Sequence, residues 1–390
     1  MLLTGLMKRT SCAEVTDSIK IRPHFVFAGY AQYGRVLATN PYLKLAKEVG
    51  DTKIEYDAFS LQVLKQTTGE KEWEKHFGYP IYGAGVYSAQ FFDNKGFGAP
   101  VAVYGVLKGP FTRWEKLTFN YDTGFGIAFN WNSYNPAANN FNISLGANQS
   151  VFIDLGINLK YPVSQNFDLS FGYSFTHFSN GAMKVPNFGL NTFSPKITLA
   201  YNIERFIPPR TTKPDAPFRR NTTIDISFFG GLKNVVYTTA SGDSIPNYRG
   251  VFYQVYGLNT VINRQVTPKS KIGFGWSLTY DASYNSTAYI DHGELEPAEG
   301  FQHGKMSLSI FPSYELVINR LSVVMQPGFY IFRKQSVDKN PLTYQRLGLH
   351  YLIGDNFLAG VCLRAYSYHI SDYIEWTVGY RLAVLSHGKP

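Results

Sequence analysis

The feature that most constrains this chain is a strict alternation of large apolar side chains with small or polar ones. Between residues 151 and 161, one set of alternate positions holds Val, Ile, Leu, Ile, Leu and Tyr, and the other holds Phe, Asp, Gly, Asn and Lys. From residue 271 to 284, aromatic and aliphatic residues alternate with Lys, Gly, Ser, Thr and Asp in the same way. Successive side chains of a β-strand point to opposite faces, whereas a helix would mix the two sets. The pattern therefore predicts strands with one apolar face and one polar face.

Comparable segments occur along most of the chain. Besides the two segments above, clear alternation occurs at 116–130, 167–179, 193–203, 304–318, 342–353 and 372–382. Weaker alternation occurs at 27–38, 53–66, 81–92, 98–108, 221–230, 249–264, 320–333 and 356–368. Together these segments predict roughly fourteen to sixteen strands of about ten residues, the size of a medium outer-membrane barrel.

The composition separates a membrane barrel from a soluble β-sandwich and from a helical membrane protein. Aromatic residues make up 16% of the chain, the mean hydropathy is only -0.17, and no apolar run approaches the length of a transmembrane helix. The polar face of the strands is rich in Gly, Ser, Thr and Asn, where a sandwich would carry many charged residues. We therefore expect an all-β fold, an antiparallel transmembrane β-barrel, in the bacterial outer membrane.

A proline-rich basic stretch divides the strands into two sets. Residues 205–220 contain Pro208, Pro209, Pro214 and Pro217 and interrupt all periodicity, which is typical of a turn or linker. The first set spans 23–204, and the second spans 221–390. The second set could close a separate barrel, but a single barrel is the simpler expectation, because two complete barrels in one chain are uncommon. The N-terminal segment 1–22 lacks a recognisable secretory signal, so we expect that signal to be already removed or missed by the chosen start.

Charge, cysteines and histidines indicate no cofactor. The net charge of +9 is scattered along the chain, which argues against nucleic acid and favours attraction to an anionic lipid surface. Cys12 and Cys362 lie at opposite ends of the chain and are expected to be unrelated thiols. The eight histidines show no spacing for a metal site, and no glycine-rich loop for a phosphate group is present in the sequence.

One segment, residues 177–191, departs from generic barrel sequence: HFSNGAMKVPNFGLN. His177 and Ser179 continue the lipid-facing register of the strand that precedes them, and Asn191 shares the lipid-facing register of the next strand. Polar groups are costly against hydrocarbon, so these three are expected to pair with one another. Histidine beside serine is a base and nucleophile arrangement, which on an outer wall would suit a membrane-dissolved ester. Alternatively, the three residues anchor a loop at the membrane interface.

The HFSN motif followed by K-x-P-N-x-G-L-N resembles the active-site signature of the lipid A 3-O-deacylases, outer-membrane barrels also called acyloxyacyl hydrolases. The resemblance implies that His177 is the general base and Ser179 is the nucleophile on an acyl ester of lipid A. It also implies that Asn187 and the backbone N–H near Ala182 hold the oxyanion, while Asn180 supports the loop. Looser similarity extends over the first two hundred or so residues, whereas the part from about Asn221 has no counterpart in the short members of the family.

The third residue of the implied triad departs from the family. The resemblance places a glutamate where this chain has Asn191, and no Asp or Glu occurs between His177 and Ile203. Asparagine can accept the imidazole N–H, but it cannot stabilise an imidazolium by charge. We therefore expect a slower enzyme, or none.

Three functions follow from these observations. The first is an esterase that acts on lipid A in the lipopolysaccharide of the outer leaflet. The second is an inactive barrel that serves as a structural or accessory subunit for outer-membrane protein partners. The third is a pore or transporter, with Lys160, Lys271 and Arg364 directed into the lumen.

Overall fold

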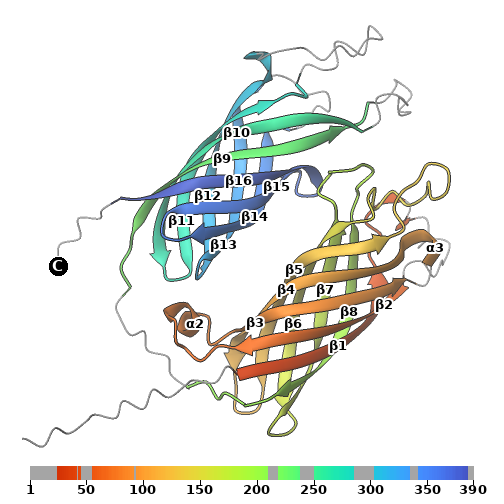
Figure 1. Cartoon of the computed structure of the whole chain (residues 1–390), viewed down its shortest axis with the longest axis vertical. Helices are drawn as coiled ribbons and strands as arrows, with labels where there is room; N and C mark the ends of the chain where they lie inside the picture. Colours follow the sequence, from red (N-terminus) through yellow and green to blue (C-terminus); the bar gives the residue numbers. More distant parts are fainter. Residues whose placement is uncertain are drawn as a thin grey trace, which may run out of the picture.

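The computed structural model describes residues 24–41, 43–44, 55–91, 94–209, 218–237, 250–284, 303–333 and 341–384. Its strands form two closed antiparallel barrels of eight strands each, which Figure 1 shows as two distinct cylinders. The all-β antiparallel barrel predicted from alternation is confirmed, and the number of strands is at the top of the expected range.

The described part of the first barrel contains eight strands and the short helices α2 and α3. Its strands are β1 (His24–Val36), β2 (Glu55–Gln66), β3 (Ile81–Phe91), β4 (Gly98–Arg113), β5 (Thr118–Trp131), β6 (Ser150–Pro162), β7 (Phe167–Ser179) and β8 (Leu190–Asn202), and its helices are α2 (Glu72–His76) and α3 (Asn94–Phe97). Each strand pairs with the next, and β8 pairs with β1 to close the sheet.

The second barrel repeats this plan. Its strands are β9 (Thr222–Val235), β10 (Val251–Thr267), β11 (Ser270–Asp281), β12 (Met306–Ile318), β13 (Leu321–Arg333), β14 (Thr343–Ile353), β15 (Phe357–Tyr366) and β16 (Ile370–Val384), and a short 3-10 helix, η3 (His303–Lys305), precedes β12. Here β16 pairs with β9 to close the sheet.

The single barrel expected from the sequence is wrong. The closing pair of the first barrel runs from Val26↔Asn202 to Val36↔Thr192, so the first strand set has no free edge to which the second set could be added. A sheet of eight tilted strands is just wide enough to close on its own side chains, and closure removes both unpaired edges. The expected 1–22 segment with Cys12, and residues 210–217 of the expected linker, lie outside the described residues.

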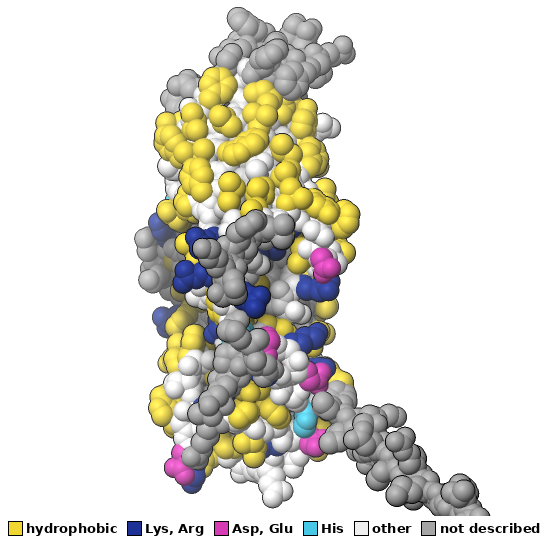
Figure 2. Space-filling view, turned by 90° about the vertical axis from the view of Figure 1, so that its left-hand side faces the viewer, with side chains coloured by type: hydrophobic (Ala, Val, Ile, Leu, Met, Phe, Trp, Pro, Cys, Tyr) yellow, Lys and Arg dark blue, Asp and Glu magenta, His cyan; other side chains and the backbone are white. Residues whose placement is uncertain are grey.

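The outer wall of both barrels is apolar. Along β7, Phe171 is 56% exposed and Tyr173 is 45% exposed, while the intervening Ser170 and Ser174 are buried in the lumen. The second barrel follows the same rule, and Figure 2 shows hydrophobic side chains covering the visible part of its wall. Exposed aromatic and aliphatic residues over whole strands are the surface that a barrel presents to lipid.

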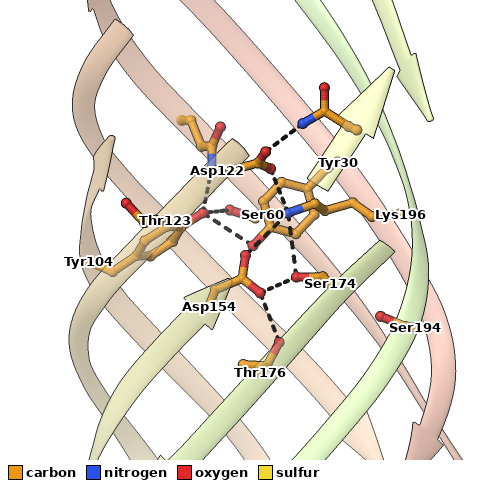
Figure 3. Close-up of polar contacts among 12 residues, drawn as sticks. Tyr30, Ser60, Tyr104, Asp122, Thr123, Asp154, Ser174, Thr176, Ser194 and Lys196 are labelled. Carbon is orange, nitrogen blue, oxygen red and sulfur yellow. Dashed lines mark hydrogen bonds and ion pairs between the residues drawn. The ribbon is translucent and has the colours of Figure 1, made fainter. Parts of the chain in front are cut away.

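Side chains fill the lumen of the first barrel. Figure 3 shows Lys196 between two carboxylates, with its Nζ 2.7 Å from Asp122 Oδ2 and 3.3 Å from Asp154 Oδ2. On the same level, the Tyr104 hydroxyl lies 2.6 Å from Ser60 Oγ. Phe152 packs against Tyr104 with ring centroids 4.8 Å apart. The lumen is therefore a packed interior of paired charges and aromatic rings.

The lumen of the second barrel holds more charge. Arg364 is fully buried, with Nε 2.7 Å from Glu375 Oε1, and Arg346 Nε lies 2.9 Å from the other oxygen of the same carboxylate. Lys271 also faces inward, 3.9 Å from Glu315. Burial of these cations is offset by their carboxylate partners, which is how charge is retained in a protein interior.

The connections between strands distinguish the two ends of each barrel. In the first barrel, segments 114–117 and 163–166 are short turns at the end near His24 and Asn202, where the longer connection 67–80 also lies. Segments 132–149 and 180–189 are long and lie at the other end. Outer-membrane barrels keep short turns in the periplasm and longer loops outside. Segment 180–189 therefore lies at the external end. Among the described residues, no helix has the length and apolarity needed to cross a bilayer.

A candidate active site on the outer wall

Two neighbouring strands bring His177, Ser179 and Asn191 together at the external end of the first barrel. His177 and Ser179 occupy the last outward positions of β7, and Asn191 is the first outward position of β8. The register pairs His177 directly with Asn191 across the two strands. The shared lipid-facing side that the alternation predicts for these residues is thus the side on which they lie.

The three side chains form one hydrogen-bonded chain. His177 Nδ1 lies 2.6 Å from Asn191 Oδ1, and His177 Nε2 lies 3.0 Å from Ser179 Oγ. Both distances are within the range for a nucleophile and base, and for a base and the group that orients it.

Thr39 orients the side-chain amide of Asn191 in this series of hydrogen bonds. The Thr39 hydroxyl donates to the Leu37 carbonyl at 3.5 Å and accepts from Asn191 Nδ2 at 3.3 Å, so the Asn191 amide presents its oxygen to the imidazole. An amide oxygen only accepts, and His177 Nδ1 therefore carries the proton. Nε2 is then free to accept the Ser179 hydroxyl proton, which is the tautomer that a general base requires.

The side chains of His177 and Ser179 are partly or fully buried, although they lie on the outer wall. Ser179 is only 5% exposed and His177 is partly buried, whereas Phe193, the next outward residue after Asn191, is 48% exposed. Polar groups in such a position are tolerated because they satisfy one another. Among the described residues, no carboxylate forms an ion pair with His177, and no group of three or more His, Cys, Asp or Glu could hold a metal ion.

Asn180 and Asn187 fix the segment that follows Ser179. The Asn180 N–H donates to Asn187 Oδ1 at 3.0 Å, and Asn180 Nδ2 donates to the Lys184 carbonyl at 2.7 Å. With its oxygen engaged, Asn187 is left with a buried Nδ2 that has no hydrogen-bond partner among the described residues. A buried unpaired donor is costly, and such groups are retained where a ligand or reacting group supplies the acceptor.

The backbone of this segment adopts left-handed conformations. Gly181 has φ +61°, Ala182 has φ +63° and Gly189 has φ +72°. The left-handed region is rare for a residue with a Cβ, and residues held there by their surroundings cluster at functional sites. At Gly189, a Cβ would lie 3.2 Å from His177 Cε1, so glycine allows the backbone to lie close over the imidazole ring.

Residues from distant loops hold the segment and were missed by sequence reasoning. Gly189 N donates to the Ser144 carbonyl at 3.0 Å, and Asn40 Nδ2 donates to Ser144 Oγ at 2.8 Å. Together with Thr39, these residues come from 37–54 and 132–149, more than thirty positions before the motif. Periodicity carries no signal for them, because loop residues follow no repeat.

Comparisons with known proteins agree with this geometry. Residues 57–202 match the family described as lipid A 3-O-deacylase (PagL), and residues 222–384 match the family described as acyloxyacyl hydrolase, C-terminal domain. The two matches cover most of β2–β8 in the first barrel and all of the second barrel. No curated protein matches the chain.

Solved structures that align with the chain include a porin and a hydrocarbon channel. They include a mutant porin of Rhodopseudomonas blastica, at 7% identity over 93% of this chain and 100% of that chain, with a TM-score of 0.16. A mutant of TodX, a monoaromatic hydrocarbon channel, aligns at 7% identity over 93% of this chain and 89% of that chain, with a TM-score of 0.18. Pseudomonas aeruginosa OccK10 aligns at 12% identity over 93% and 99%, with a TM-score of 0.21. TM-scores of this size carry no argument about function.

Three observations agree on the family of this protein. They are the family matches, the closed barrels with apolar outer walls, and the motif at 177–191. This chain belongs to the lipid A 3-O-deacylase family, as a deacylase-like barrel of the bacterial outer membrane that carries the acyloxyacyl hydrolase C-terminal domain as a second barrel.

Proposed function

We propose that this protein is an esterase that removes a 3-O-linked acyl chain from lipid A in the outer leaflet. The observation that supports the proposal most is the hydrogen-bonded chain from Asn191 through His177 to Ser179 on the outer wall. A site on that wall, at the external end, can be reached by a lipid without its leaving the membrane.

The proposed reaction is an acyl transfer in two steps. His177 Nε2 takes the Ser179 proton while Oγ bonds to the ester carbonyl carbon, and the protonated imidazole then gives that proton to the departing sugar oxygen. Water, activated by the same nitrogen, next breaks the acyl–Ser179 bond and releases a fatty acid. Asn187 Nδ2 and the backbone N–H near Ala182 would donate to the oxyanion of both intermediates, a contribution of about 10²–10³ in rate for each donor.

Asn191 sets the expected speed of this reaction. It keeps the imidazole in the tautomer that the reaction needs, because its Oδ1 accepts from Nδ1. It supplies no negative charge, so the imidazolium formed in each step is less stabilised than beside a carboxylate. A slow deacylase is therefore expected.

Lipid A from cells that express the protein tests the proposal. Mass spectrometry should show the loss of one acyl chain with the wild type and with Ser164→Ala, a matched change in a turn at the periplasmic end. Ser179→Ala should leave lipid A fully acylated. Identical lipid A from wild type and Ser179→Ala would refute the esterase.

Restoring a carboxylate tests the role of Asn191. We expect Asn191→Glu to raise the hydrolysis rate of purified protein on lipid A at least about tenfold, because a charge partner stabilises the imidazolium. Activity gained only with glutamate would show a weakened enzyme. Inactivity of both proteins would favour an accessory role.

The accessory subunit is the second candidate function. It is favoured by the uncharged Asn191 and by the second barrel, whose wall exposes residues such as Trp376 at 64%. A stoichiometric outer-membrane partner retained in mild detergent would support it, and migration of the chain alone would count against it. The packed, charge-paired lumens favour both of these functions over a pore, which a conductance measurement in planar bilayers would test.

A further inference from the structure

The segment that follows Ser179 contacts the second barrel. A Cβ built at Gly181 would lie 2.6 Å from Ile374 Cγ1 of β16 and 3.5 Å from Leu363 Cδ1 of β15. Two residues later, the Met183 carbonyl accepts a hydrogen bond of 3.3 Å from Asn234 Nδ2 of β9. Gly181 is thus required twice, for its left-handed φ and for the room it leaves to Ile374.

The contact occupies a defined patch near the external end of the second barrel. Leu363 pairs directly with Ile374, and β9 lies on the other side of β16. Asn234 and Leu232 share the outward face of β9, yet Asn234 is only 9% exposed while Leu232 is 54% exposed. Along β16, Ile374 is half-buried whereas Val378 on the same face is 62% exposed. The burial is therefore local to the loop of the first barrel.

A second contact joins the other ends of the two barrels. Lys269, in the short turn between β10 and β11, places its Nζ 4.9 Å from the centre of the Phe77 ring, which follows α2. Both residues belong to periplasmic ends, and both partners of the Gly181 contact belong to external ends. The two barrels consequently stand with the same orientation across the membrane and touch at both ends.

We infer that the second barrel positions the oxyanion-binding segment of the first barrel, with Ile374 and Asn234 as its positioning residues. The inference rests on the esterase proposed above. Asn180 and Ala182 adjoin the contacted residues, and Asn187 is tied to Asn180 by its Oδ1. Apolar contact at Gly181 and a hydrogen bond at Met183 hold the segment on either side of Ala182, the residue whose neighbouring N–H would serve the oxyanion.

The effect on rate follows from the precision that oxyanion donors need. Catalytic groups must be held within about 0.5 Å of their productive positions, and a displacement of about 1 Å can cost about 10²-fold. Ile374 contacts Gly181 and Asn234 contacts the Met183 carbonyl, and neither residue belongs to the set proposed to act on the ester. Their loss should lower kcat and leave substrate binding nearly unchanged.

Kinetics of the full chain test the inference. In detergent with a soluble acyl ester, we expect Ile374→Ala and Asn234→Asp to lower kcat about 10–100-fold, with KM changed less than about twofold. Val378→Ala, on the same face of β16 but away from the loop, is the matched control and should have wild-type kcat. Asn234→Gln keeps the amide donor and should recover part of the lost rate. Heat-dependent migration in gels shows that each variant is folded, and Ile374→Val replaces Ile374→Ala if the latter does not fold.

A cross-link tests the contact between the two barrels independently of enzymatic activity. Met183→Cys combined with Asn234→Cys should be joined by a short bismaleimide in intact membranes, and Met183→Cys combined with Val378→Cys should not. Mass spectrometry of peptides identifies the joined pair. Failure of the first pair to cross-link would overturn the inference.

The kinetic outcomes separate the inference from the proposed function. If the wild type and Ser179→Ala are equally inactive, the esterase fails, while the cross-link still reports on the contact. If the wild type is active but Ile374→Ala and Asn234→Asp keep its kcat, the positioning role is overturned and the esterase stands. A raised KM at unchanged kcat would also overturn it, because the second barrel would then bind substrate rather than position the segment.

Discussion

The hairpin β7–β8 of the first barrel and the hairpin β15–β16 of the second occupy the same place in their barrels, yet only in the first does the apolar outer face end in polar residues. The outward register of β7 ends in His177 and Ser179, whereas the outward register of β15 near its end holds Val361 and Leu363. The connection also differs, since 180–189 is a structured segment and 367–369 is a tight turn. The barrel fold alone therefore creates no site. The site needs a polar end of the outward register and a segment that covers it.

The largest difference between the hairpins should appear on removing their histidines. We expect His177→Gln to lower the rate of ester hydrolysis about 10²–10⁴-fold, because Ser179 loses its proton acceptor. His369→Gln, in the exposed turn of the second hairpin, should leave the rate unchanged. Hydrolysis of a soluble ester in detergent measures the rates of both variants. An equal loss of rate in His177→Gln and His369→Gln would contradict the assignment of the site to the first hairpin.

The buried charges in the lumen of the second barrel predict an effect on stability. Glu375→Gln should lower the free energy of unfolding by about 3–5 kcal/mol, because Arg346 and Arg364 lose their shared carboxylate while buried. Denaturant titration followed by gel migration measures the loss. Glu115→Gln, in an exposed turn of the first barrel, is the control, and equal stability of the two variants would show that the lumen pairs contribute little.

The buried Nδ2 of Asn187, in the segment between β7 and β8, predicts a loss of catalytic rate when it is removed. Asn187→Ala should lower kcat about 10²–10³-fold, because it removes the buried Nδ2 donor that has no partner among the described residues. It also removes the Oδ1 that accepts the Asn180 N–H, so heat-dependent migration in gels is needed to show that the variant is folded. Asn166→Ala, at the periplasmic end of the same hairpin, should keep the wild-type kcat. A wild-type kcat in Asn187→Ala would assign the oxyanion to backbone donors alone.

The smallest effect is expected at Thr39. Thr39→Val removes the hydroxyl that orients the Asn191 amide, a hydrogen bond worth about 0.5–1.5 kcal/mol, so kcat should fall about 2–10-fold. Thr68→Val, in an exposed periplasmic loop, provides a matched control. An unchanged rate in Thr39→Val would mean that other contacts orient Asn191.

Local periodicity predicted the strands and the face on which the site lies. The outward face of β7 and of β8 follows from alternation, so the amino-acid sequence alone places His177 and Asn191 on the same side of the sheet, while their direct pairing is seen only in the structure. Closure does not follow from alternation, because the pairing of β8 with β1 joins residues far apart in sequence and depends on strand tilt. The residues that hold the site in place could not be predicted from periodicity either, since Thr39 and Ser144 lie in loops. The contact at Gly181 required the placement of two complete barrels.

An even number of strands in each barrel places the link between Asn202 and Thr222 at the periplasmic end. The two barrels are thus permanently tethered beneath a contact that forms at the opposite end of the membrane. A tether turns association into an intramolecular step with an effective concentration that is typically in the millimolar range for short linkers. An external contact made of a few residues can then stay populated, because the link keeps the two barrels at a high effective concentration.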